Sequence, residues 1–105
     1  MNFSNYYIKT VQEKLELDNY AQVQKVIGGT SGHMTAIKKE QKTLTKKQVK
    51  EVSRILKVDE CVIAAAMMAD KAKTKEEKSL WTQLIKGYKN LPNSVSLDLM
   101  LTSHN

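Results

Sequence analysis

Apolar residues recur along most of this chain every three or four positions, which is the spacing of one face of a helix. The first four segments with this spacing cover about residues 5–16, 20–27, 30–39 and 45–56. A fifth begins near residue 60 and contains the run "CVIAAAMMA", and a sixth extends from about residue 74 to "NLPN". The pattern therefore predicts an all-α fold with six helices.

Residues suited to cap helices stand where these segments begin. Asp18 or Asn19 can cap the second helix, and Asp59 can cap the fifth. The sequences "TKKQ" at 45–48 and "TKEE" at 74–77 have the spacing of a capping box, in which the first and fourth residues satisfy each other's backbone N–H groups. These residues therefore predict where the helices begin.

The apolar face of each segment predicts the core. Its members are Tyr7, Ile8, Val11, Leu15, Tyr20, Val23, Ile27, Met34, Ile37, Val49, Val52, Leu56, Val62 and Ile63. Cys61 lies within an apolar helical run, so we expect a buried thiol.

The last residues of the chain follow a different pattern. Val95, Leu97, Leu99 and Leu101 alternate with other residues, which is the period of a strand. A strand without a partner in its own chain leaves its edges open. It can pair with the same tail of a second copy, pack as an extended arm, or be a frayed terminus.

Length and charge narrow the class of protein. With 105 residues, 41% of them hydrophobic, the chain suits one small domain, and no apolar run approaches the roughly 20 residues of a membrane span. No signal peptide is recognisable and one cysteine permits no internal disulfide, so we expect a cytosolic protein. The net charge of +6 indicates a polyanionic partner, most commonly nucleic acid.

Residues that carry catalytic or metal chemistry are sparse. The histidines are His33 and His104, and no histidine–cysteine cluster has the spacing of a zinc site. The sequence "GGTSGHMT" lacks the lysine of a phosphate-binding loop. We therefore expect neither an enzyme nor a cofactor, metal or small-molecule site.

The stretch from Val26 to Gln48 combines a glycine turn with a predicted helix whose two faces differ. Gly28 suits a helix end in a left-handed conformation. Met34 and Ile37 would hold the third helix against the second, as in a helix-turn-helix. The opposite face is small and polar, and such a helix can enter the major groove of DNA. Its members are Ser31, Gly32, Thr35, Ala36 and Lys39, and Thr30 or Ser31 starts the helix.

Lysines gather at the end of this third helix and at the start of the fourth. They are Lys38, Lys39, Lys42, Lys46 and Lys47. Lysine side chains and the free N–H groups at a helix start both contact DNA phosphates. We predict that this cluster anchors the third helix to a duplex.

The helix order, with "TSGHMTAIKKEQKTLT" and "LTKKQVKEVSRILKVDECVIAAAM", resembles the Cro/lambda-repressor-type (XRE) helix-turn-helix family, and "ADKAKTKEEKSLWTQLIKG" is similar to small members from filamentous phages. The resemblance spans about residues 7–87 and implies that Met34 and Ile37 are buried, Thr30 caps the third helix, and Ser31, Gly32, Thr35 and Ala36 face bases. It places His33 near the backbone or thymine methyl groups.

Two positions depart from that family's pattern. Gln24 stands where a small residue is usual, so either it lies at a tight helix crossing or Val23 takes that role. Glu40 stands where glycine or asparagine is usual, which places a carboxylate near the phosphates.

These features predict a five-helix DNA-binding domain at 1–73, a dimerisation helix at 74–92 and an extended tail at 93–105. The expected function is that of a phage-type repressor that binds operator DNA as a homodimer without a membrane or a small-molecule ligand. The expected dimer interface consists of Trp81, Leu84, Ile85, Tyr88, Leu97 and Leu99. Two alternatives stay open: a phage inhibitor that grips an acidic host protein, and an antitoxin-like regulator.

Overall fold

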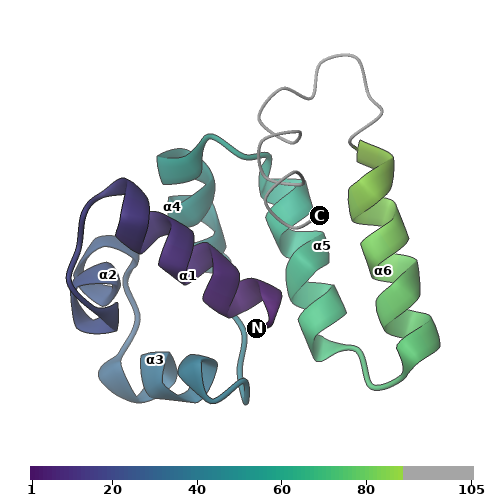
Figure 1. The fold of residues 1–105 in the computed structure, drawn as a ribbon, viewed down its shortest axis with the longest axis horizontal. Helices are drawn as coiled ribbons and strands as arrows, with labels where there is room; N and C mark the ends of the chain where they lie inside the picture. Colours follow the sequence, from purple (N-terminus) through teal and green to yellow (C-terminus); the bar gives the residue numbers. More distant parts are fainter. Residues whose placement is uncertain (89–105) are drawn as a thin grey trace.

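The computed structural model describes residues 1–88, and its regular structure there is entirely α-helical (Figure 1). The helices are α1 (Phe3–Lys14), α2 (Tyr20–Ile27), α3 (Ser31–Lys38), α4 (Lys46–Leu56), α5 (Glu60–Lys71) and α6 (Lys75–Tyr88). The prediction of an all-α fold is confirmed. The predicted tail strand, with Leu97 and Leu99, lies outside the described residues.

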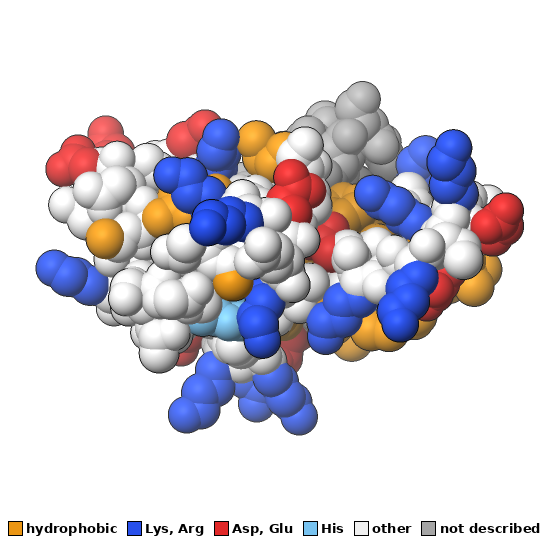
Figure 2. Space-filling view, turned by 90° about the horizontal axis from the view of Figure 1, so that it is seen from below, with side chains coloured by type: hydrophobic (Ala, Val, Ile, Leu, Met, Phe, Trp, Pro, Cys, Tyr) orange, Lys and Arg blue, Asp and Glu red, His pale blue; other side chains and the backbone are white. Residues whose placement is uncertain are grey.

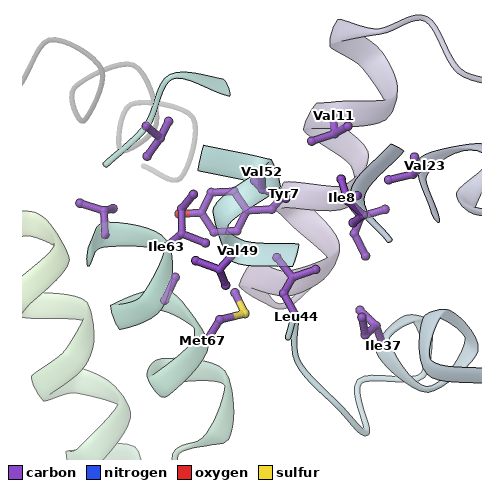
Figure 3. Close-up of a cluster of buried hydrophobic side chains, with 14 of the residues drawn as sticks. Tyr7, Ile8, Val11, Val23, Ile37, Leu44, Val49, Val52, Ile63 and Met67 are labelled. Atoms are coloured by element: carbon purple, nitrogen blue, oxygen red, sulfur yellow. The ribbon is translucent and has the colours of Figure 1, made fainter. Parts of the chain in front are cut away.

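One apolar core joins the first five helices, and α1 crosses its centre. Figure 3 shows the Tyr7 ring extending from α1 toward α4 and α5, beside Val49, Val52 and Ile63. Ile8 and Val11 face Val23 of α2 and Ile37 of α3 in the same view. The predicted apolar faces therefore meet in one place, as their helical spacing requires.

Helix α6 packs along α5 at the edge of the molecule (Figure 1). Ile85 is 2% exposed and belongs to the core cluster. The short connection at Ala72–Thr74 allows this antiparallel pairing, because α-helices joined by few residues pack side by side.

The first turn of α1 is held by a carboxylate from a distant helix. Asp70, near the end of α5, accepts hydrogen bonds from the backbone N–H groups of Phe3 and Ser4 at 2.9 and 2.8 Å. It also accepts one from the Ser4 hydroxyl at 2.7 Å. Asn2 caps the same helix by accepting from the Asn5 N–H at 3.0 Å. Orphan donors at the helix start are thus satisfied both locally and across the fold.

The caps at Asn19, Thr30, Thr45 and Asp59 agree with the sequence, and at 74–77 the Thr74 hydroxyl accepts from the Glu77 N–H at 3.1 Å, which is one bond of the predicted capping box. The end of the first helix differs. Asn19 rather than Asp18 caps α2. The predicted helix at 5–16 is observed at 3–14, and Leu15, expected in the core, is 39% exposed. The helix ends at Lys14, so Leu15 is the C-cap rather than a residue of the helix face, and Glu16 after it adopts a positive φ of 54°.

Cys61 is exposed, so the expectation of a buried thiol is wrong. The buried positions of α5 are Val62, Ile63, Ala66, Met67 and Ala69, and Cys61 lies on another side of the helix. The negative charge of Asp59 is the main reason why the pKa of this thiol is raised, and a side-chain hydrogen bond between the thiol and Asp59 raises the pKa further.

Candidate nucleic-acid interface

Two glycines make the turn between α2 and α3, and the two helices cross rather than run parallel (Figure 1). Gly28 has φ 88° and ψ −178°, and Gly29 has φ 102°. Gly28 thus has the positive φ that its position predicted, but with an extended ψ rather than the left-handed helical one. This region of backbone space is essentially restricted to glycine.

Gln48 of α4 braces this turn. Its side chain is 1% exposed, and its amide Nε2 donates to the Gly28 carbonyl at 2.8 Å. Its Oε1 accepts from the Thr45 N–H at 2.9 Å, and the Thr45 hydroxyl accepts from the Gln48 N–H at 3.2 Å. The predicted capping box is therefore confirmed, and the same residue joins the turn to the start of α4.

Two features require glycine at position 29: its positive φ and the closeness of the Gln48 side chain. A Cβ atom placed on Gly29 would lie 2.5 Å from Nε2 of Gln48. The turn and the first residues of α4 consequently form one packed unit, which places Lys46 and Lys47 in a fixed relation to α3.

The inner face of α3 is formed as the sequence predicts. Met34 and Ile37 are buried, and the Thr30 hydroxyl accepts from the His33 N–H at 3.1 Å to cap the helix. Val23 is fully buried, whereas Gln24 is half-buried and donates to the Gly29 carbonyl at 3.1 Å. Val23 therefore takes the buried role in α2, and Gln24 supports the turn.

The outer face of α3 is open. Ser31, Gly32 and Thr35 are exposed, and Ala36 is half-buried. The protein's own interior covers none of the first three. This face is therefore free to contact another molecule.

Polar contacts hold both flanks of α3. On one flank His33 is half-buried, and its Nε2 lies 3.0 Å from the Thr43 carbonyl oxygen. A carbonyl oxygen only accepts, so this nitrogen carries a proton and His33 fastens the loop after α3. On the other flank the Lys38 ammonium lies 5.8 Å from the centre of the Tyr20 ring, a cation–π contact that orients it toward α2.

The predicted lysines are all exposed, and none forms an ion pair within residues 1–88. They are Lys38, Lys39, Lys42, Lys46 and Lys47. The ion pair found in that range joins Arg54 to Glu51 on the far half of α4 at 2.7 Å. Figure 2 views the molecule from the side on which α3 lies, and lysine side chains surround a largely uncharged surface there. The positive charge near α3 is thus available to an outside anion.

Two further lysines belong to this surface, and the sequence analysis missed them. Lys25 of α2 and Lys50 of α4 line the groove that also contains Lys46 and Lys47. Lys25 falls in the last turn of α2 and Lys50 one turn after Lys46, so helical spacing was the signal that could have found them.

Glu40 ends α3 with a positive φ of 61°. Its N–H donates to the Ile37 carbonyl at 2.9 Å, and the Gln41 N–H donates to the Ala36 carbonyl at 2.9 Å. This pair of bonds is a Schellman motif, which usually has glycine at the position of Glu40. The exposed carboxylate therefore lies next to Lys39, where it opposes anion binding.

The exposed apolar residues of α6 are Leu80, 56% exposed, and Leu84, 48% exposed. They lie four positions apart and share one face of the helix. Trp81 is half-buried, and Ile85 is buried inside its own chain. Of the predicted interface residues described in α6, Leu84 is thus the most accessible, and Ile85 is inaccessible in this conformation.

Searches against protein-family models, curated proteins and solved structures found no significant match to this chain. Among the described residues, no helix has both the length and the apolar character needed to cross a membrane. The same residues contain no group of three or more histidine, cysteine or acidic side chains placed to hold a metal ion.

Proposed function

We propose that this chain is a sequence-specific double-stranded DNA-binding transcriptional regulator of the XRE helix-turn-helix type, and that it acts as a repressor. The observation that supports this proposal most directly is the exposed outer face of α3, flanked by lysines that form no ion pair within residues 1–88. An α-helix fits the major groove of B-DNA, and unpaired lysines beside it supply the phosphate contacts that give affinity.

In this mechanism α3 enters the major groove with Ser31 and Thr35 facing the base edges. Lys39 and Lys42 neutralise phosphates beyond the end of α3. The start of α4, braced by Gln48, presents further lysines and free backbone N–H groups to the same strand. Repression follows from occupation of the promoter and requires no catalysis.

The proposal includes a homodimer, because regulators of this kind bind two half-sites about one helical turn apart. The apolar ridge of Leu80 and Leu84 on α6 supports it, since exposed leucines one turn apart suit a helix–helix contact. A two-fold axis through that ridge would let both copies present α3 to one side of a duplex.

The test is the salt dependence of DNA binding by the full chain. Duplexes enriched from a random library are titrated by fluorescence anisotropy at several salt concentrations with Lys39→Ala, Lys42→Ala and the control Lys75→Ala. Each of the first two variants should bind more weakly, with a salt slope smaller by about one unit. Lys75 begins α6, away from α3, and its variant should keep the slope of the unmodified chain.

Unchanged slopes for both Lys39→Ala and Lys42→Ala would refute the proposed interface. Failure to enrich any duplex would refute DNA binding itself, and a complex with an acidic protein would then favour the inhibitor hypothesis.

A further inference from the structure

Thr35 occupies the middle of the exposed face of α3, one turn after Ser31 and one turn before Lys39. Its side chain ends in a hydroxyl and a methyl group. The hydroxyl Oγ1 donates a hydrogen bond to the Ser31 carbonyl oxygen at 3.0 Å. A threonine hydroxyl has a single proton, so this bond leaves no proton for an acceptor on a base.

The methyl group is the part of the exposed Thr35 side chain that this hydrogen bond leaves unengaged. Both groups are bonded to the same carbon in staggered positions, so turning the hydroxyl toward the backbone turns the methyl away from it. Thr35 can then offer a base edge two things, its methyl group and the lone pairs of an oxygen held against the helix.

The groups on the major-groove edges of the bases decide whether the methyl group or the lone pairs of Thr35 make the contact. Guanine N7 and O6, adenine N7 and thymine O4 are acceptors and need a donor, which Thr35 lacks in this conformation. The amino groups of adenine and cytosine need a lone pair, but Oγ1 is drawn back toward the preceding turn. The 5-methyl group of thymine needs only an apolar partner, and the Thr35 methyl supplies one.

The neighbouring residue allows the close approach that such a contact needs. A Cβ atom placed on Gly32 would meet nothing nearer than the Thr30 hydroxyl oxygen at 4.0 Å, so the fold itself leaves room for a side chain there. Glycine weakens a helix relative to alanine, and this one has no internal packing reason. Gly32 is three positions from Thr35 and therefore borders it on the helix surface.

We infer that Thr35 is a specificity-determining residue whose methyl group reads the 5-methyl group of a thymine in the major groove. The inference rests on the proposed DNA-binding function and identifies the base that the centre of α3 recognises. Gly32 admits the base edge, while the lysines beside it hold the backbone.

The test compares thymine with deoxyuridine, which differs only by lacking the 5-methyl group. Each thymine of an enriched duplex is replaced in turn, and dissociation constants are measured for the full chain and for Thr35→Val and Thr35→Ser. At one thymine in each half-site, replacement should weaken binding by the unmodified chain about fourfold, the worth of one buried methyl group. Thr35→Val keeps the methyl and should keep this sensitivity, whereas Thr35→Ser should lose it.

Thermal unfolding followed by circular dichroism checks that both variants fold as the unmodified chain does. Equal affinity for thymine and deoxyuridine at every position would overturn the inference and leave DNA binding intact. Persistence of the effect in Thr35→Ser, or its loss in Thr35→Val, would overturn it too, because the hydroxyl or another residue would then be the reader. If no duplex is enriched, the inference and the proposed function both fail.

Discussion

Replacing Gln48 by methionine tests whether one side chain joins the glycine turn to α4. Methionine has nearly the same length and volume as glutamine, so Gln48→Met fills the site but removes the amide group. The two strong bonds lost are the 2.8 Å bond to the Gly28 carbonyl and the 2.9 Å bond from the Thr45 N–H. The long contact from Nε2 to the Met34 sulfur, at 3.6 Å, is lost with them and contributes little.

The expected cost follows from those two bonds. A hydrogen bond contributes about 0.5–1.5 kcal/mol net, so two of them correspond to about 2 kcal/mol. For a domain of this size, that loss lowers the unfolding temperature by roughly 8–16 °C. Because Gly28 and Thr45 are exposed, water partly replaces the lost partners, which makes larger losses unexpected.

Gln48→Glu sharpens the test. It keeps an oxygen to accept from Thr45 but places a second oxygen against the Gly28 carbonyl, so the two acceptors repel when the carboxyl is ionised. When protonated, that carboxyl donates to Gly28, which raises its folded-state pKa above the unfolded value of about 4.3. Stability of the variant should therefore be highest below about pH 4 and fall as the pH rises through the folded-state pKa.

The assay is urea unfolding at 25 °C from pH 4 to 7, with Gln83→Met on the exposed side of α6 as the matched control. The control should change the free energy of unfolding by less than about 0.5 kcal/mol. If Gln48→Met matched that control, or if the deficit of Gln48→Glu were independent of pH, the proposed brace would be wrong.

Three further predictions concern the left-handed residues, the exposed thiol and the ridge on α6. Glu40→Gly and Glu16→Gly should each raise the free energy of unfolding in urea by about 1 kcal/mol, because each removes a side chain from a residue with positive φ. Only Glu40→Gly should also tighten DNA binding, and equal DNA affinity of the two variants would contradict a place for Glu40 near phosphates. Asp59→Asn keeps the cap of α5 and removes the charge that raises the pKa of the Cys61 thiol, so the midpoint pH for alkylation of Cys61 by iodoacetamide should decrease. An unchanged midpoint would show that Asp59 does not cause the raised pKa. Leu84→Asp should shift sedimentation toward the monomer, and because Leu84 is half exposed in its own chain the monomer should still fold. An unmodified chain that is monomeric at high concentration would refute the dimer.

The sequence predicted most of the fold because its signals were local. The box of Thr45 and Gln48, the cap at Thr30, and the inward pair of Met34 and Ile37 each depend on residues within four positions. Spacing and capping operate over one helical turn, so they can be read without knowledge of the rest of the chain.

The contacts that the sequence did not predict join distant positions. The bond from Gln48 to Gly28 spans 20 residues, and the one from His33 to Thr43 spans 10. Cys61 was misplaced for another reason: its run is apolar on nearly every side, so spacing gives no contrast between the inner and outer faces. Which lysines line the groove between the end of α2 and the start of α4 likewise depends on how these two helices pack.

The carboxylate that caps the first turn of α1 belongs to Asp70, near the end of α5. Phe3 and Ser4 leave the ribosome before α5 does, because Asp70 follows Ser4 by 66 positions. Until α5 emerges, Asp70 cannot accept from those two amide groups, so the first turn of α1 lacks this long-range cap on a nascent chain. A translation product that stops before α5 therefore lacks the carboxylate that caps the first turn of its own first helix.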